Sequence, residues 1–229
     1  MSRLAAVPGR ALTSVSLHAV QAARRVLGTA SLERAVEGKV LVFTGLGSEV
    51  ERDAADALDR AGATAVLAGE GHGCPLTDPE AVDRLARSVL RSHGGVDLLV
   101  NGTTHAPPAE GLDDFERAMQ AGYYTPVRLA LAFLPGMRAR RSGHIVNLRS
   151  PVSRAERGPQ AHRLSAHAAL SSFSRCLATE VLHEGVAVSA HELPRGRDAE
   201  DPGAATALCD VVAERPRRSG RSVQPLGRR

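Results

Sequence analysis

The sequence predicts an α/β protein built on one doubly wound, Rossmann-like parallel sheet. Short apolar runs alternate with amphipathic segments from Lys39 to about residue 214. Most of these runs are continuous rather than alternating, which is typical of strands buried on both faces of a sheet. A chain of 229 residues is long enough for one sizeable domain and short for two. We therefore expect an N-terminal extension with room for one helix, one core domain and a basic tail, over residues 1–37, 38–214 and 215–229 respectively.

The same periodicity predicts the order of the elements. Strands are expected at 39–44, 64–68, 96–101, 143–148 and 186–191, and helices at 49–61, 79–92, 112–140, 160–184 and 203–214.

One connection departs from this alternation. Only Gly69-Glu70-Gly71-His72-Gly73 separates the strand at 64–68 from the next apolar patch, Cys74-Pro75-Leu76. A parallel crossover needs about a dozen residues, so these two segments cannot be neighbouring parallel strands. Either the third strand of the usual pattern is lost, or this patch is a short irregular edge.

Composition excludes several classes of protein. No apolar run approaches the roughly 20 residues that span a bilayer, so no membrane partner is expected. Arginines gather at both ends of the chain, but without interleaved aromatic residues or a binding motif, so we expect solvated ends and no nucleic-acid partner. Cys74, Cys176 and Cys209 have neither pairing nor metal-ligand spacing, which indicates free buried thiols, no metal site and a cytoplasmic location.

Five further stretches carry a family resemblance. They are Gly38-Lys39-Val40-Leu41-Val42-Phe43-Thr44-Gly45, Val96-Asp97-Leu98-Leu99-Val100-Asn101, Pro135-Gly136-Met137-Arg138-Ala139-Arg140, Gly143-His144-Ile145-Val146-Asn147 and Ala168-Ala169-Leu170-Ser171-Ser172-Phe173-Ser174-Arg175. In order and spacing they resemble the short-chain dehydrogenase/reductase (SDR) family over about residues 38 to 214. The resemblance implies a Rossmann domain, NAD(P)-dependent oxidoreduction of a small molecule, and assembly into dimers or tetramers through the helices at 112–140 and 160–184.

The cofactor loop departs from the family pattern. The family has TGxxxGxG, whose glycines let the backbone approach a pyrophosphate at a helix N-terminus. Here Gly45 keeps the first glycine, while Glu49 and Glu51 replace the other two. Two unit charges 4 Å apart interact by about 4 kcal/mol at an effective dielectric of 20, so these carboxylates should weaken dinucleotide binding. We hypothesise that one carboxylate occupies the phosphate position.

Other cofactor positions are also altered. The adenine-contacting Asp of the family is Pro75 here, and the NNAG-like motif keeps only Asn101. Glu70 follows the second strand, where the family often has an acidic residue for the ribose. The positions at which the resemblance still implies an NAD(P) contact are Thr44, Gly45, Gly47, Glu70 and Asn101.

The catalytic positions differ more. In the family a Tyr transfers the proton, a Lys four residues later lowers its pKa, a Ser orients the substrate and an Asn holds a water. By spacing, Ser150 keeps the Ser position, while Gly122, Arg163 and His167 hold those of Asn, Tyr and Lys. Realignment does not restore the site, because the only tyrosines are Tyr123 and Tyr124 and the only lysine is Lys39.

Other chemistries remain open for these residues. Ser150 with His162 or His167 could form a nucleophile–base pair, although no nucleophile elbow or Asp partner accompanies them. Arg163 and His167 lie one helical turn apart and could bind an anion. After the last strand, Leu193-Pro194-Arg195-Gly196-Arg197-Asp198 indicates a shortened substrate lid.

The sequence thus predicts an SDR-family pseudoenzyme that keeps the fold and serves in association, as a homo-oligomer or with a related SDR subunit. The alternatives are an active NAD(P)-dependent oxidoreductase with non-standard catalytic residues, and a degraded gene product without a selected activity.

Overall fold

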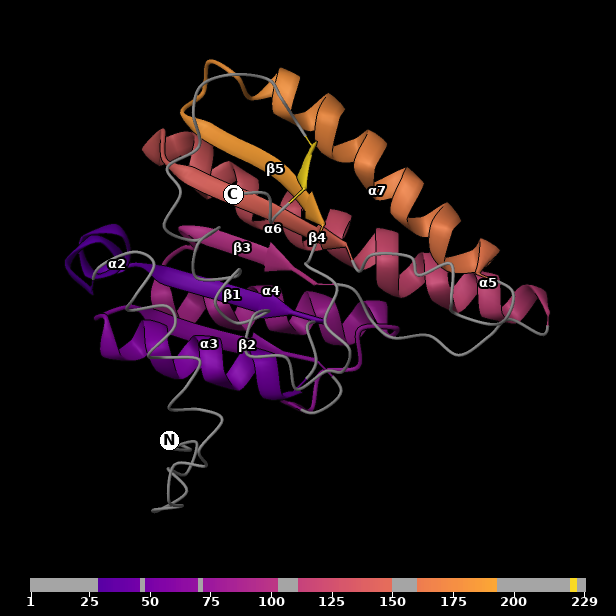
Figure 1. Cartoon of the computed structure of the whole chain (residues 1–229), viewed down its shortest axis with the longest axis horizontal. Coiled ribbons are helices and arrows are strands. Elements are labelled where there is room, and N and C mark those ends of the chain that lie inside the picture. Colours follow the sequence, from indigo (N-terminus) through magenta and orange to yellow (C-terminus); the bar gives the residue numbers. More distant parts are fainter. Residues whose placement is uncertain are drawn as a thin grey trace.

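The computed structural model describes residues 29–45, 48–69, 72–102, 111–149, 160–192 and 223–225. Within these ranges the chain forms a six-stranded, all-parallel sheet in the order β2-β1-β3-β4-β5-β6. This confirms the predicted α/β fold class (Figure 1). The strands are β1 (Val40–Thr44), β2 (Thr64–Ala68), β3 (Leu98–Asn101), β4 (Gly143–Arg149), β5 (Val186–Glu192) and β6 (Val223–Pro225).

Helices cover both faces of the sheet (Figure 1). Apolar residues of α4, α6 and α7 bury one face together with Val42, Leu99 and Ile145, which sit on consecutive paired strands. On the other face α2 and α3 pack over Leu41 and Phe43. The helices are α2 (Thr29–Val36), α3 (Ser48–Arg60), α4 (Pro79–His93), α5 (Leu112–Met119), the π-helix η2 (Gln120–Tyr124), α6 (Thr125–Arg140) and α7 (Ala161–Glu180).

Three boundaries differ from the prediction. The helix expected over 112–140 contains the π-helical turn η2, which apolar spacing cannot reveal. The helix expected to reach residue 184 ends at Glu180, ahead of a turn that closes at Gly185 with φ +77°. The strand expected at 96–101 begins at Leu98, although the Asp97 amide still donates to the Val40 carbonyl at 2.8 Å and the Asp97 side chain accepts from the Val40 amide at 2.9 Å.

The ends of the chain were predicted less well. Helix α2 falls within the extension expected to carry one helix, whereas residues 1–28 lie outside the described ranges. Residues 223–225, expected to belong to a basic tail, instead form strand β6 and pair with Ala190, His191 and Glu192 of β5. A three-residue strand is too short to give a periodic signal. The predicted helix at 203–214 and the predicted short lid after residue 192 lie outside the described residues.

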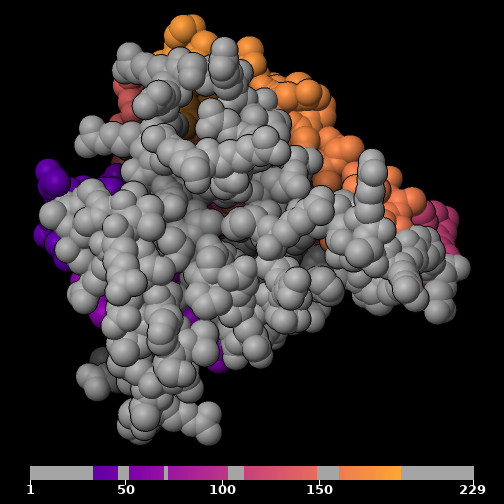
Figure 2. All heavy atoms as spheres, in the orientation of Figure 1, coloured from indigo at the N-terminus to yellow at the C-terminus, as the bar shows by residue number. Residues whose placement is uncertain are grey.

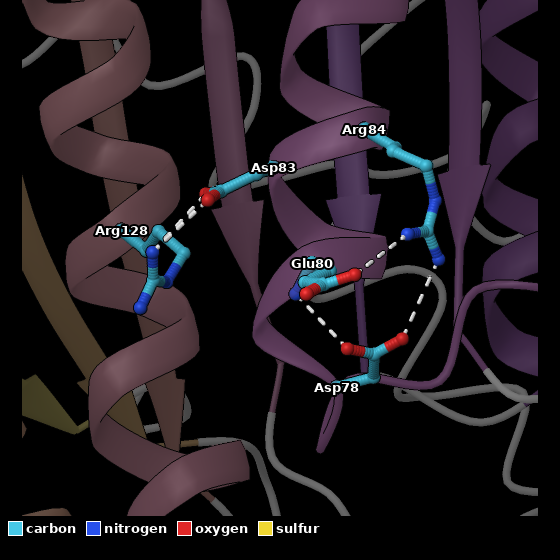
Figure 3. Close-up of polar contacts among 5 residues, drawn as sticks. All are labelled: Asp78, Glu80, Asp83, Arg84 and Arg128. Carbon is cyan, nitrogen blue, oxygen red and sulfur yellow. Dashed lines mark hydrogen bonds and ion pairs between the residues drawn. The ribbon is translucent and has the colours of Figure 1, made fainter.

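The short connection after β2 leaves that strand at the sheet edge. Within the described residues no strand lies beyond β2, so the first of the two predicted outcomes holds there: the third strand of the usual pattern is absent. The chain passes directly into α4, where Asp78 caps the helix by accepting from the Glu80 amide at 2.9 Å. Arg84 lies within 3.4 Å of the Asp78 carboxylate (Figure 3).

Three further contacts fasten this connection and helix α4 to the rest of the core. The Thr125 hydroxyl donates to the Leu76 carbonyl at 2.6 Å, and Cys74 is buried in a cluster with Ala68 and Ala81. Arg128 of α6 reaches Asp83 of α4 at 3.1 Å (Figure 3). The segment that replaces the third strand is thus tied to the helices beside it.

Candidate functional site

The candidate site lies at the carboxyl ends of β1, β3 and β4, where an open parallel sheet binds its ligands. The chain crosses from β2 past β1 to β3, so the switch point lies between β1 and β3. There Gly45 follows β1 with φ +68°, a conformation that glycine adopts without strain. A Cβ at this position would lie 3.2 Å from the Gly102 carbonyl oxygen and 3.4 Å from the Leu76 side chain.

A chain of buried hydrogen bonds crosses the sheet beneath this edge. The Thr44 hydroxyl donates to the Asn101 side-chain oxygen at 3.2 Å, and the Asn101 amide donates to Asn147 at 2.8 Å. The Asn147 amide then donates to the Ser174 hydroxyl at 2.8 Å, which donates to the Leu170 carbonyl at 2.7 Å. All four side chains are at most 2% exposed. The chain therefore joins three strands to α7.

This network gives two predicted cofactor residues another role. The Thr44 and Asn101 side chains are engaged inside the sheet, where they hold the strand ends in register. Sequence reasoning missed the roles of Asn147 and Ser174. The available signal was a polar residue inside the apolar run Ile145-Val146-Asn147-Leu148, since a buried amide requires hydrogen-bond partners.

The structure brings together the positions expected for the family's Asn, Tyr and Lys. A Cβ added at Gly122 in η2 would lie 3.1 Å from the Ala166 Cβ of α7. Ala166 directly precedes His167 and lies about one turn after Arg163, and both of these side chains are buried, at 6% and 5% exposed. A π-helical turn at this point is of the kind often found at functional sites.

An arginine and a histidine stand at the positions that spacing assigns to the family's Tyr and Lys. An Arg guanidinium stays protonated at all relevant pH values, so Arg163 cannot exchange a proton as a phenol does. Tyr123 packs edge-on against Phe173, with ring centroids 6.5 Å apart. Phe173 lies ten residues beyond Arg163, roughly 15 Å along the helix. Lys39 precedes β1, at the end of the strand opposite to the site.

Buried polar atoms without partners lie beside these positions. Within the described residues, both ring nitrogens of His162, the Gln120 side-chain nitrogen and the Gln160 side-chain oxygen make no hydrogen bond. His162 is 1% exposed and packs edge-on against Phe115 of α5, with centroids 5.9 Å apart. Burying a polar group without a hydrogen-bond partner lowers the stability of the fold. The residues in this part of the α5–α7 contact are therefore not those that would give the highest stability.

Five sequence-predicted residues cannot be placed in the same detail. Ser150, Gly47 and Glu70 lie outside the described residues, so the possible pairing of Ser150 with His162 or His167 is not tested. Residues 49 and 51 fall in the first turn of α3, whose N-terminus points to the carboxyl edge of the sheet. A negative charge in a first helical turn favours the helix dipole and opposes an anion at the same helix N-terminus.

The remaining expectations concern cysteines, metals and membranes. Cys74 is buried, and burial raises the pKa of its thiol, but Cys176 is exposed on α7, contrary to the expectation of buried thiols. No three His, Cys, Asp or Glu side chains gather as a metal site in the described ranges. Among the described helices, none has the length and apolar character needed to cross a membrane.

Comparison with known proteins identifies the class. The model of the family described as short chain dehydrogenase matches residues 20–194. The chain therefore belongs to the short-chain dehydrogenase family, and this confirms the resemblance seen in the sequence.

Particular relatives are named as oxidoreductases. The chain is 33% identical over 186 residues to an uncharacterized oxidoreductase of Mycobacterium tuberculosis, covering 68% of this chain and 54% of the relative. It is 32% identical to a fatty acyl-CoA reductase of Acinetobacter baylyi over 69% and 63% of the two chains. The chain thus spans little more than half the length of these curated relatives.

Solved structures agree on the fold. A short-chain dehydrogenase from Streptomyces avermitilis superposes with a TM-score of 0.66 at 25% identity, covering 82% of this chain and 88% of that one. A metagenomic short-chain oxidoreductase in complex with NADP gives a TM-score of 0.62 at 20% identity over 83% and 96% of the chains. At that identity the second likeness concerns the fold alone.

Proposed function

We propose that this chain is a family member that does not perform Tyr/Lys-dependent hydride transfer and that acts by association, with a second copy or with a related SDR subunit. The observation that carries this proposal is the buried stripe of α7, where Arg163 and His167 stand at the Tyr and Lys positions. Hydride transfer to a carbonyl requires a proton donor whose pKa is matched to neutral pH, and a buried guanidinium is not one.

The close packing of Gly122 against Ala166 also supports the absence of Tyr/Lys-dependent hydride transfer. A Cβ at position 122 would approach the Ala166 Cβ to 3.1 Å, so Ala166 would have to give by a few tenths of an ångström to admit a side chain there. Reversion of a single catalytic residue is not expected to restore the reaction.

Weak dinucleotide binding is part of the proposal. Glu49 and Glu51 replace glycines in the first turn of α3, and their charge opposes a pyrophosphate at that helix N-terminus. When bound in the family, the nicotinamide cofactor supplies the hydride. In this chain we expect NAD(P) to bind poorly, so that no substrate is turned over through it.

The exposed apolar side chains support association. All six large hydrophobic residues exposed in the described part of the chain lie on or directly after the helices of one side: Leu112, Phe115, Tyr124, Leu131, Leu164 and Leu182. α5 and α7 contact each other, and their surfaces adjoin along one side of the molecule (Figure 2). Such a concentration of exposed apolar side chains is typical of a protein–protein contact.

A cytoplasmic location fits the same proposal. Cys74 and Cys176 carry free thiols, as expected in a reducing compartment. The alternative function is an active NAD(P)-dependent oxidoreductase with non-standard catalytic residues. It is favoured by the left-handed conformation retained at Gly45, which would still admit a close backbone approach by a ligand.

Cofactor titration separates the two functions. Calorimetry of the purified chain with NADH and NADPH is expected to show no binding at micromolar concentration. The variant Glu49→Gly/Glu51→Gly should bind at least about tenfold more tightly, which corresponds to 1.4 kcal/mol of relieved repulsion. The matched control is Glu33→Gly/Glu37→Gly, which removes two carboxylates that are not part of the cofactor loop. Micromolar binding by the unaltered chain, with reduction of any carbonyl substrate, would establish the alternative.

A further inference from the structure

The outer edge of β2 exposes backbone groups in a defined pattern. The Thr64 amide donates to the Lys39 carbonyl at 2.8 Å, and Val66 is paired with Val42 of β1. In a parallel ladder alternate residues turn their backbone groups toward the same neighbour, so Thr64 and Val66 face β1. The N–H and C=O groups of Ala65 and Leu67 therefore point away from the sheet, on the side where no described strand pairs with β2.

One of these outward groups is already engaged. The Ala65 amide donates to a carboxylate oxygen of Asp59 at 3.0 Å. Asp59 lies in the last turn of α3, just before the chain turns into β2. Within the described residues, the Leu67 amide and the carbonyls of Ala65 and Leu67 make no backbone hydrogen bond on that side.

The strand itself carries none of the usual protection. Its sequence is Thr64-Ala65-Val66-Leu67-Ala68, without a charge or a proline. Natural edge strands are commonly blocked by such residues, because unpaired edges join to other chains. Here the only protecting group identified among the described residues is the Asp59 carboxylate.

We propose that the outer edge of β2 is a pairing surface for β2 of a second copy of this chain, and that Asp59 keeps it closed. The edge is complementary to itself. In an antiparallel pair centred on Val66, Ala65 of one copy lies opposite Leu67 of the other, and each such pair exchanges two backbone hydrogen bonds. Two of the resulting four bonds need the Ala65 amides.

Asp59 therefore controls half of the possible bonds. While its carboxylate holds the Ala65 amide, a second copy would bring the Leu67 carbonyl against a negative charge. Removal of the carboxylate frees both donors. Since a net hydrogen bond contributes about 1 kcal/mol, two recovered bonds should favour pairing by at least about fivefold. A five-residue edge buries little surface, so the pair should be weak and is best detected covalently.

A cysteine at position 66 reports on this pairing alone. At the centre of the antiparallel pair the two residues 66 form a non-hydrogen-bonded pair about 4.5 Å apart, within disulfide range. The test uses full-length protein with Cys74→Ala/Cys176→Ser/Cys209→Ser and Val66→Cys, oxidised mildly and separated without reductant. Adding Asp59→Ala should raise the rate of disulfide dimer formation about fivefold or more. The matched control Asp56→Ala removes a carboxylate one turn earlier on the same helix and should leave the rate unchanged.

Two further variants check the mechanism. Ala65→Pro in the Asp59→Ala background removes the N–H that Asp59 otherwise holds and should abolish the gain, since proline is tolerated at an edge but cannot donate. If circular dichroism shows that Asp59→Ala is unfolded, Asp59→Asn replaces it and should give a smaller gain. Equal rates for the Asp59 and Asp56 variants would overturn the proposal, as would rapid cross-linking with Asp59 intact.

The outcome is independent of the proposed association through α5 and α7. β2 lies at one edge of the sheet, while α7 packs over β4 and β5 toward the other (Figure 1). Cross-linking at position 66 does not report on the helical surface.

Discussion

Gly45 has a left-handed backbone conformation, and it precedes a loop whose sequence departs from the family pattern. Its φ of +68° costs a residue with a side chain about 1–2 kcal/mol, and a Cβ would also approach the Gly102 carbonyl oxygen to 3.2 Å. A glycine here therefore stabilises the fold whether or not a dinucleotide binds. This explains how the first glycine of the motif can persist where the second and third are replaced.

The variant Gly45→Ala should lower the free energy of unfolding by about 1–3 kcal/mol, because it adds backbone strain and a close contact. Urea denaturation followed by circular dichroism measures the change. Gly69→Ala is the control: its φ is not in the left-handed region and an added Cβ meets nothing within 4 Å. A loss of stability as large in Gly69→Ala would show that the conformation of Gly45 is not the cause.

His144 makes stability depend on pH. Its ring accepts or donates a hydrogen bond with the Ser189 hydroxyl at 2.8 Å, and burial, with a smaller effect of His191, lowers the pKa of the ring to about 4. The unfolded chain, with a pKa near 6.5, therefore binds the proton first as pH falls. The free energy of unfolding should decrease between about pH 6.5 and pH 4, by up to about 1.4 kcal/mol per pH unit.

The variant His144→Gln should reduce this slope by up to about 1.4 kcal/mol per pH unit, the contribution of one proton. Gln can still form a hydrogen bond with Ser189, but it does not titrate. Urea denaturation at a series of pH values from 4.5 to 7.5 measures the slope. His93→Gln, at an exposed position of α4, should leave it unchanged. A slope that persists unaltered in His144→Gln would assign the pH dependence to other groups.

At the scale of elements, α7 makes two separate sets of packing contacts. Its buried residues carry the stripe His162, Arg163, Ala166 and His167 near the N-terminus, and the hydroxyl of Ser174 further along. The first part faces α5 and η2, while Ser174 ties the helix to β4 through Asn147. Ser174 thus attaches the helix to the sheet at a point separate from positions 163 and 167.

Ser174→Ala and Ser171→Ala form a matched pair that tests this attachment. Each serine donates to the carbonyl four residues earlier, at 2.7 Å, but only Ser174 also accepts from Asn147. We expect Ser174→Ala to cost about 1–3 kcal/mol, because the Asn147 amide is left buried without its acceptor. Ser171→Ala should cost less than about 0.5 kcal/mol. Chemical denaturation of the two variants compares them directly, and equal costs would contradict a role for the buried chain.

At the scale of the whole molecule, the helical side is the proposed contact surface. The variants Leu131→Glu and Leu164→Glu place a charge on exposed positions of α6 and α7, at 56% and 44% exposure. Size-exclusion chromatography with light scattering should show an oligomer for the unaltered chain and a shift to monomer for these variants, because burial of an unpaired charge is costly. Arg60→Glu, at an exposed position of α3 on the other face of the sheet, should leave the equilibrium unchanged. A strictly monomeric unaltered chain would refute the association.

Much of the architecture was predictable because it follows from local patterns. Continuous apolar runs such as Leu41 to Phe43 and Ile145 to Leu148 indicate strands buried on both faces, and these strands are where the sequence places them. The missing third strand followed from a connection too short for a crossover. Strand β6 and the π-helical turn at Gly122 were not predictable, since a short edge strand and one added residue in a helical turn leave no periodic signal.

The sequence by itself determined the family and the identity of the residues at the catalytic positions, because fixed spacing along strands and helices places them. The contacts among those positions were decided by the tertiary structure. Only packing shows that Gly122 closes on Ala166, that Arg163 and His167 are buried, and that Asp59 reaches the amide of Ala65. These contacts join residues from separate elements, and their geometry depends on how the helices seat on the sheet rather than on any local propensity.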